Sequence, residues 1–136
     1  MQDKRVDNYF KAWLSYDTML LTQIFSPEAT YDIKPRERVL IGQDEICRYW
    51  KRNKDRQKKL DVQWDVINST QDQAISKFLA NFIDIAEQQN QSILGVIHFL
   101  FNKNGQIIAL SETYTKTVNS FESVSQKSYL PVSKKL

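Results

Sequence analysis

The second half of the chain alternates between apolar and polar residues with a period of two. From Leu60 to about Val118 this alternation falls into four runs, separated by polar segments near 69–73, 87–91 and 102–105. Such runs predict half-buried strands, and short polar turns between them predict antiparallel pairing as a meander. The inward positions of the four runs are Leu60, Val62, Trp64 and Val66; Phe78, Ala80 and Phe82; Ile93, Ile97, Phe99 and Phe101; and Ile108, Leu110, Glu112 and Tyr114.

The first half has the spacing of helices. A stripe at i, i+3, i+4, i+7 and i+8 predicts a first helix with Val6, Tyr9, Phe10, Trp13 and Leu14 on its buried face. Asp17 is expected to cap a short second helix that ends before Pro27, and residues 29–33 alternate as a strand. A third helix is predicted after Gly42, with Asp44 as its cap and Ile46, Tyr49 and Trp50 on its apolar face.

Helices followed by strands predict an α+β domain with the helices on one face of the sheet. A chain of 136 residues fits one domain, which we place at 1–120. Residues 121–136 are polar and weakly patterned, and we interpret them as a C-terminal tail.

The net charge of +3 comes largely from six cations, Lys51, Arg52, Lys54, Arg56, Lys58 and Lys59. We interpret them as the solvated end of the third helix, because no stacking aromatic residues are interleaved with them as nucleic-acid binding would require. With a single cysteine, no signal peptide and no apolar run of membrane-spanning length, the sequence predicts a cytoplasmic protein without a membrane role.

The order of elements, together with FSPEATYDI, the third helix led by Gly42 and FLFNKNGQIIALSETY, resembles the nuclear transport factor 2-like superfamily, in its SnoaL-like branch of polyketide cyclase and ketosteroid isomerase-like proteins. The resemblance spans roughly residues 3–118. It implies a cone-shaped, curved, mixed or antiparallel sheet with three helices on its concave side, an arrangement also called cystatin-like. This fold carries isomerases, cyclases, hydrolases, dehydratases and non-catalytic binding modules, so it does not choose among them.

When the sequence is aligned with the ketosteroid isomerases, it has the family's residue at one of three functional positions. Tyr9 matches the tyrosine of the oxyanion hole, whereas Ile33 and Ile97 stand where that family has its base aspartate and its protonated aspartate. Since isoleucine can neither carry a proton nor donate a hydrogen bond, the resemblance argues against that mechanism.

The same overlay places a mostly aromatic and aliphatic set in or near the cone. Its members are Tyr9, Trp13, Tyr31, Ile33, Tyr49, Trp50, Phe78, Phe82, Asp84, Ile97, Phe99, Leu110, Glu112 and Tyr114. Such a lining suits a small, flat, apolar ligand held by one or two polar groups. The same residues could instead fill the cone as ordinary core, and the sequence leaves both interpretations open.

Glu112 is the strongest candidate for chemistry, because it stands between Leu110 and Tyr114 on the predicted buried face of the last strand. Desolvation would raise the pKa of its carboxyl and favour an acid–base role, whereas a nearby cation would make it a structural partner. A shift of one residue in the alternation would place it on the surface. Asp84, near the end of its strand, is a weaker candidate of the same kind.

Metal and cofactor chemistry finds no support in the sequence. His98 has the opposite parity to Ile97 and Phe99, so it is expected on the outer face of the sheet. A single His and a single Cys predict no metal site, and Cys47 has no evident base partner. Nucleotide-binding motifs are absent too, so no cofactor is predicted.

The outer face of the third run is also apolar, with Leu94, Val96 and Leu100, which predicts that a partner covers it. We expect a homodimer through this face, with a second protein or the C-terminal tail as alternatives. Two hypotheses for function follow. One is a SnoaL-like enzyme that uses Glu112 or Asp84, with Tyr9 as hydrogen-bond donor, on a small apolar or aromatic substrate; the other is a non-catalytic module that binds a ligand or a protein.

Overall fold

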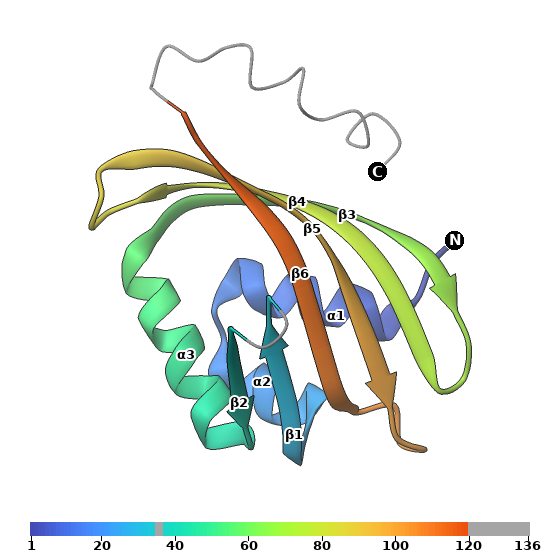
Figure 1. The fold of residues 1–136 in the computed structure, drawn as a ribbon. Helices are drawn as coiled ribbons and strands as arrows, with labels where there is room; N and C mark the ends of the chain where they lie inside the picture. Colours follow the sequence, from blue (N-terminus) through green and yellow to red (C-terminus); the bar gives the residue numbers. More distant parts are fainter. Residues whose placement is uncertain (35–36, 120–136) are drawn as a thin grey trace.

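The computed structural model describes residues 1–34 and 37–119, in which six strands form one curved sheet with three helices on its concave side (Figure 1). The helices are α1 (Lys4–Ser15), α2 (Thr18–Ile24) and α3 (Gln43–Arg56). The strands are β1 (Phe25–Ile33), β2 (Arg38–Ile41), β3 (Gln57–Ser69), β4 (Gln73–Asp84), β5 (Gln89–Phe101) and β6 (Ile107–Asn119). The predicted α+β cone is therefore confirmed.

The strands lie in the order β2-β1-β6-β5-β4-β3. Strands β3 to β6 pair antiparallel with their neighbours in sequence, as the alternation predicted, and β1 pairs antiparallel with β2. Among the strands of the described residues, the one parallel pair is β1 with β6, which makes the sheet mixed. This pairing places the first strand beside β6, so side chains of β1 and β6 meet on the concave face.

Aromatic rings from α1 fill much of the cone. Phe10 is fully buried and stacks on Trp64 of β3, with ring centroids 4.9 Å apart and 15° between the planes. Its ring also lies 5.9 Å from that of Phe78 on β4. Leu14, expected on the same stripe, is 40% exposed instead, because it lies at the edge of that stripe. The inner layer of the cone is thus a packed core.

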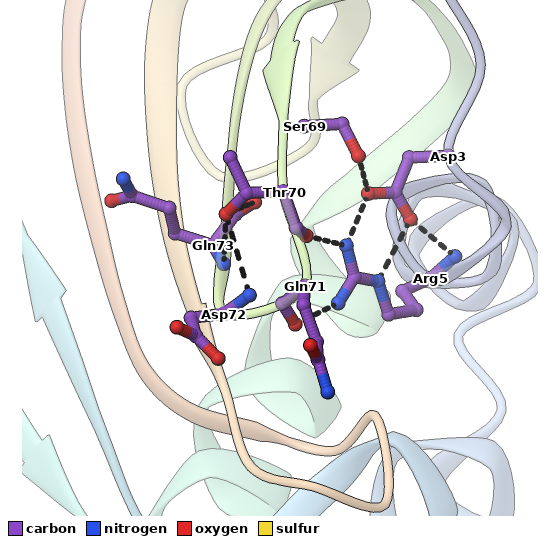
Figure 2. Close-up of polar contacts among 7 residues, drawn as sticks. All are labelled: Asp3, Arg5, Ser69, Thr70, Gln71, Asp72 and Gln73. Atoms are coloured by element: carbon purple, nitrogen blue, oxygen red, sulfur yellow. Dashed lines mark hydrogen bonds and ion pairs between the residues drawn. The ribbon is translucent and has the colours of Figure 1, made fainter.

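The start of α1 is tied to the turn between β3 and β4 (Figure 2). Asp3 caps the helix by accepting from the Arg5 backbone N–H at 2.9 Å, and its carboxylate also accepts from Ser69 Oγ at 2.7 Å. The Arg5 guanidinium donates to that carboxylate and to the carbonyl oxygens of Thr70 and Gln71. These hydrogen bonds from Arg5, with that from Ser69, lower the pKa of Asp3 to about 2 against the opposing effect of burial. The network fixes where α1 crosses the sheet.

Four further details differ from the sequence predictions. Ile108, expected on the inward face, is 41% exposed and Ile107 is buried instead, because the register of β5 and β6 shifts between Leu100 and Phe101. Residues 38–41 form an additional edge strand, missed because it is short and only Leu40 is buried in it. Asp44 does not cap α3; the helix begins two residues earlier than predicted, at Gln43, with Gly42 in the capping position and no side-chain cap. Lys58 and Lys59 belong to β3 rather than to the helix end, because pairing of Gln57 with Asp84 starts the strand there.

The predicted cap of the second helix is confirmed. The Asp17 carboxylate caps α2 by accepting from the backbone N–H groups of Met19 and Leu20. Gly95 allows close packing between strands, because a Cβ there would lie 2.5 Å from the Thr113 carbonyl oxygen and 2.9 Å from the Phe78 ring. Among the described helices, none has the length and apolar character needed to cross a membrane. The predicted tail, 121–136, lies outside the described residues.

Candidate functional site

Glu112 lies on the concave face of β6, as strand alternation predicted, and is only 6% exposed. Its neighbour Leu110 on the same face is 1% exposed. In the sheet, Glu112 stands between Ile33 of β1 and Ile97 of β5, so its cross-strand neighbours on both sides are apolar. The two positions that argued against ketosteroid isomerase chemistry therefore form the apolar surroundings of this carboxyl.

Two tyrosines connect to the carboxyl in a buried chain of hydrogen bonds. The Tyr31 hydroxyl donates to Glu112 Oε1 at 2.9 Å, and the hydroxyl oxygens of Tyr9 and Tyr31 are 2.9 Å apart. Each phenol has one proton, so when Tyr31 donates to the carboxylate, Tyr9 must donate to Tyr31. The chain places two aligned O–H dipoles against any negative charge on Glu112.

Burial governs the titration of this group. Removal from water raises the pKa of Glu112 to about 7, and the hydrogen bond from Tyr31 limits the rise. Burial, reinforced by the charge of Glu112, raises the pKa of Tyr9 and of Tyr31 well above the ordinary phenol value. Both tyrosines stay protonated, and Glu112 is the group that exchanges its proton near neutral pH.

A cavity of about 30 Å³ adjoins the carboxyl. It is lined by Trp13, Tyr31, Tyr49, Trp50, Asn53, Gln57, Ile93, Glu112 and Tyr114. Its volume is roughly that of one water molecule. The Trp50 indole N–H in this wall is buried and has no hydrogen-bond acceptor among the described residues. The cavity therefore places a carboxyl and a phenol beside a space for one small polar group.

Five of the residues proposed for the site line this cavity, namely Trp13, Tyr31, Trp50, Glu112 and Tyr114. Tyr49, which the overlay also placed there, lines it too. Tyr9 lies behind Tyr31 and is fully buried, so its hydroxyl serves the hydrogen-bond chain and not the cavity. The other predicted apolar members are buried in the core without lining this cavity: Ile33, Phe78, Phe82, Ile97, Phe99 and Leu110.

Asp84 is not part of the cavity lining. It ends β4, and its carboxylate accepts from the Arg56 guanidinium at 3.2 Å and from the backbone N–H of Glu87 at 3.0 Å. The residue is 7% exposed, and its carboxylate is held by this ion pair and turn. Its position indicates a structural role.

Sequence reasoning missed Asn53, Gln57 and Ile93. The first two lie where α3 ends and β3 begins, and Gln57 Oε1 accepts from Trp13 Nε1 at 3.2 Å and from the Tyr16 hydroxyl. Ile93 has the inward parity of β5 and lies near the end of the cone where Tyr114 sits. The polarity of the helix end concealed the first two, because it was interpreted as solvated surface.

The remaining reactive side chains lie elsewhere. His98 is on the outer face, where its Nε2 is 2.8 Å from Gln73 Oε1. Burial raises the pKa of Cys47, which disfavours the thiolate that a nucleophile needs. Within residues 1–34 and 37–119, no group of three or more His, Cys, Asp or Glu side chains is arranged to hold a metal ion.

Comparison of the sequence finds no matching protein-family model and no matching curated protein. Solved structures do match. SalBIII, an epoxide hydrolase/cyclase-like enzyme in pyran ring formation in the polyether salinomycin, superposes with a TM-score of 0.73 and 16% identity over 85% of this chain and 94% of that chain. A protein from Shewanella denitrificans OS-217 assigned as a SnoaL-like polyketide cyclase gives a TM-score of 0.73 and 15% identity over 93% of this chain and 95% of that chain. The chain has the nuclear transport factor 2-like fold.

A third matching structure contains a bound ligand. Rv0760c from Mycobacterium tuberculosis, in complex with estradiol-17beta-hemisuccinate, gives a TM-score of 0.72 and 11% identity over 83% of this chain and 95% of that chain. At such identities the likeness establishes the nuclear transport factor 2-like fold alone. The function of this chain has to be argued from its own site.

Proposed function

We propose that this protein binds a small, mostly apolar ligand in the mouth of its cone and that Glu112 transfers a proton to or from it. The observation that carries the proposal is a buried carboxyl with a pKa of about 7 in the wall of a cavity. A carboxyl with this pKa exists in both forms at neutral pH, so it can act as general base or general acid.

The surroundings of Glu112 favour a chemical role over a structural one. Among the described residues, no Lys, Arg or His forms an ion pair with it, so its charge is not used to hold a cation. A buried carboxyl without such a partner destabilises the folded protein when it ionises. Perturbed groups of this kind concentrate at functional sites. The reaction classes that fit are isomerisation, cyclisation, dehydration and hydrolysis of a small apolar or aromatic substrate.

The size of the cavity restricts how the ligand binds. Pockets for small molecules usually have roughly 300–1,000 Å³, about ten times the volume beside Glu112 or more. Only the reacting end of a ligand fits next to the carboxyl, and its body must extend past the partly exposed rings of Tyr49 and Tyr114.

A non-catalytic module is the second candidate, and the filled cone favours it. Aromatic rings from α1 and the sheet occupy the space in which larger ligands would bind. In that case the protein would recognise a ligand or another protein, and Glu112 would not accelerate a reaction.

Ring opening of 5-nitrobenzisoxazole tests for proton transfer, because a base removes the ring C–H proton while the N–O bond breaks to give a coloured phenolate. We expect the intact protein to accelerate this reaction, with a rate that rises with pH through a midpoint of about 7. Glu112→Gln should lower the rate by about 10²-fold or more. The exposed Glu28→Gln is the control and should leave it unchanged. Equal rates in both variants and the intact protein would favour the non-catalytic candidate.

The convex face of the sheet supports a homodimer as part of this proposal. Leu94 and Val96 of β5 are 38% and 43% exposed, and with Thr113 and Thr115 of β6 they line a shallow apolar depression of about 360 Å³. A second copy of this chain is the simplest partner for such a face.

A cytoplasmic location and a separate C-terminal tail at 121–136 also remain part of the proposal.

Val96→Asp should convert the dimer to a monomer, since an unpaired charge buried in an interface costs several kcal/mol. Size-exclusion chromatography with light scattering measures this change at micromolar concentration. Ile41→Asp, at an exposed apolar position on β2, should leave the dimer intact. A monomeric mass for the unmodified protein would overturn the homodimer.

A further inference from the structure

A groove of about 260 Å³ lies between β2 and α3, beside the cone. Its lining consists of three arginines, Arg38, Arg48 and Arg52, with Val39, Leu40 and Glu45. The three arginine side chains are exposed, and within residues 1–34 and 37–119 none of them forms an ion pair. The Glu45 carboxylate accepts a hydrogen bond from the backbone N–H of Ile41 at 2.6 Å. The groove therefore has an excess of positive charge.

The arrangement of these charges suits an anion. Arg48 and Arg52 are four residues apart on α3, where like charges repel and destabilise a helix. Arg38 approaches the same groove from β2. A carboxylate or phosphate between the three guanidinium groups would remove the repulsion and accept charge-assisted hydrogen bonds from planar donors that match its geometry.

Tyr49 lines the Glu112 cavity and lies close to one arginine of the groove. The Arg38 guanidinium carbon lies 5.8 Å from the centre of the Tyr49 ring. The Tyr49 ring also lies 5.8 Å from that of Tyr31, which donates to Glu112, and both tyrosines line the cavity. A ligand that leaves the cavity past Tyr49 therefore meets the arginines.

We infer that Arg38, Arg48 and Arg52 bind the acidic group of the ligand, a carboxylate or phosphate, while its apolar body lies against Tyr49 and its other end reaches the Glu112 cavity. This inference rests on the proposed function, because it names the class of ligand that the cavity takes. It assigns the arginines to positioning, and proton transfer stays with Glu112.

Two compounds of the same shape test this inference. Calorimetry at constant ionic strength compares 2-naphthoate with the neutral 2-naphthalenemethanol, and an NMR titration with inorganic phosphate follows the arginine side chains. We expect 2-naphthoate to bind about tenfold more tightly than the alcohol and phosphate to give saturable shifts at Arg38, Arg48 and Arg52. The double variant Arg48→Gln, Arg52→Gln should abolish both the tighter binding of 2-naphthoate and the saturable phosphate shifts. Lys51→Gln, Lys54→Gln removes the same charge from α3 outside the groove lining and should leave them intact.

Each of three other results would overturn a specific part of the inference. Equal binding of the two compounds would overturn the acidic ligand class and leave the proposed cavity function standing. Saturable phosphate shifts without binding of either compound would show an anion site that is not joined to the cavity, which also overturns the inference. Phosphate shifts that do not saturate, or that persist in the arginine double variant, would remove the anion site itself.

Discussion

Glu112→Gln is expected to make the protein more stable at neutral and alkaline pH relative to the wild type. The pKa of this carboxyl rises from 4.5 to about 7 on folding, so the folded state binds more protons than the unfolded state between these values. The stabilisation linked to the bound proton is complete below pH 4.5 and is lost as the pH rises to about 7. Each pKa unit corresponds to about 1.4 kcal/mol, which gives a change on the order of 3 kcal/mol.

Urea unfolding of both proteins from about pH 4 to about pH 9 measures this effect. The free energy of unfolding of the Gln variant minus that of the wild type should rise by about 3 kcal/mol between pH 4.5 and pH 7 and then level off. Glu28→Gln, at an exposed position on β1, should show no such rise. A difference that stays constant with pH would mean that Glu112 titrates alike in the folded and unfolded states.

Phe10→Ala is expected to destabilise the protein by about 3–5 kcal/mol, because it removes a fully buried ring from the centre of the cone. The ring stacks on Trp64 and lies within 6.4 Å of the Tyr9, Trp13 and Phe78 rings, so neighbours on α1, β3 and β4 all lose contacts. Chemical denaturation gives the free energy, and benzene added to the variant should restore part of it by filling the space.

Leu14→Ala is the matched control on the same helix, since Leu14 is 40% exposed. It should cost less than about 1 kcal/mol. If Phe10→Ala costs no more than Leu14→Ala, the cone is not packed in the way described, and an open ligand pocket becomes the better description of its interior.

The sheet was predictable because alternation is a local property. Each run from Leu60 to Val118 carries its own inward and outward sets, and the parity alone placed Glu112 inside and His98 outside. The edge strand β2 was not predictable, because four residues with one buried side chain carry almost no pattern. Its place in the sheet comes from its pairing with β1, which no pattern within residues 38–41 specifies.

The residue types near the site were predictable, but the sequence did not show which of them line the cavity and which are buried in the core. Phe78 and Tyr114 share the inward face of the sheet, yet Phe78 belongs to the packed interior and Tyr114 to the cavity wall. Strand parity gives the face on which a side chain lies, and the curvature of the sheet decides how far it is from solvent. The contacts of Gln57 with Trp13 and Tyr16 join residues more than 40 positions apart, which no local pattern specifies.

The chemistry of Glu112 also depends on contacts that the local sequence pattern does not specify. The sequence left open whether a cation would hold the carboxyl ionised. The structure instead supplies a phenol from Tyr31, with Tyr9 behind it, and apolar neighbours at Ile33 and Ile97. These partners come from three elements distant in sequence, α1, β1 and β5, and together they set the pKa that makes proton transfer at neutral pH feasible.

The titration of the Glu112 side chain tests this account most directly. Selective ¹³C labelling of glutamate and comparison with Glu112→Gln assign the carboxyl resonance, whose chemical shift is then followed from about pH 4 to about pH 9. The account predicts a midpoint of about 7 for Glu112. A midpoint near the ordinary value of 4.5 would contradict it, because the carboxyl would then be ionised throughout the neutral range and could not act as an acid there.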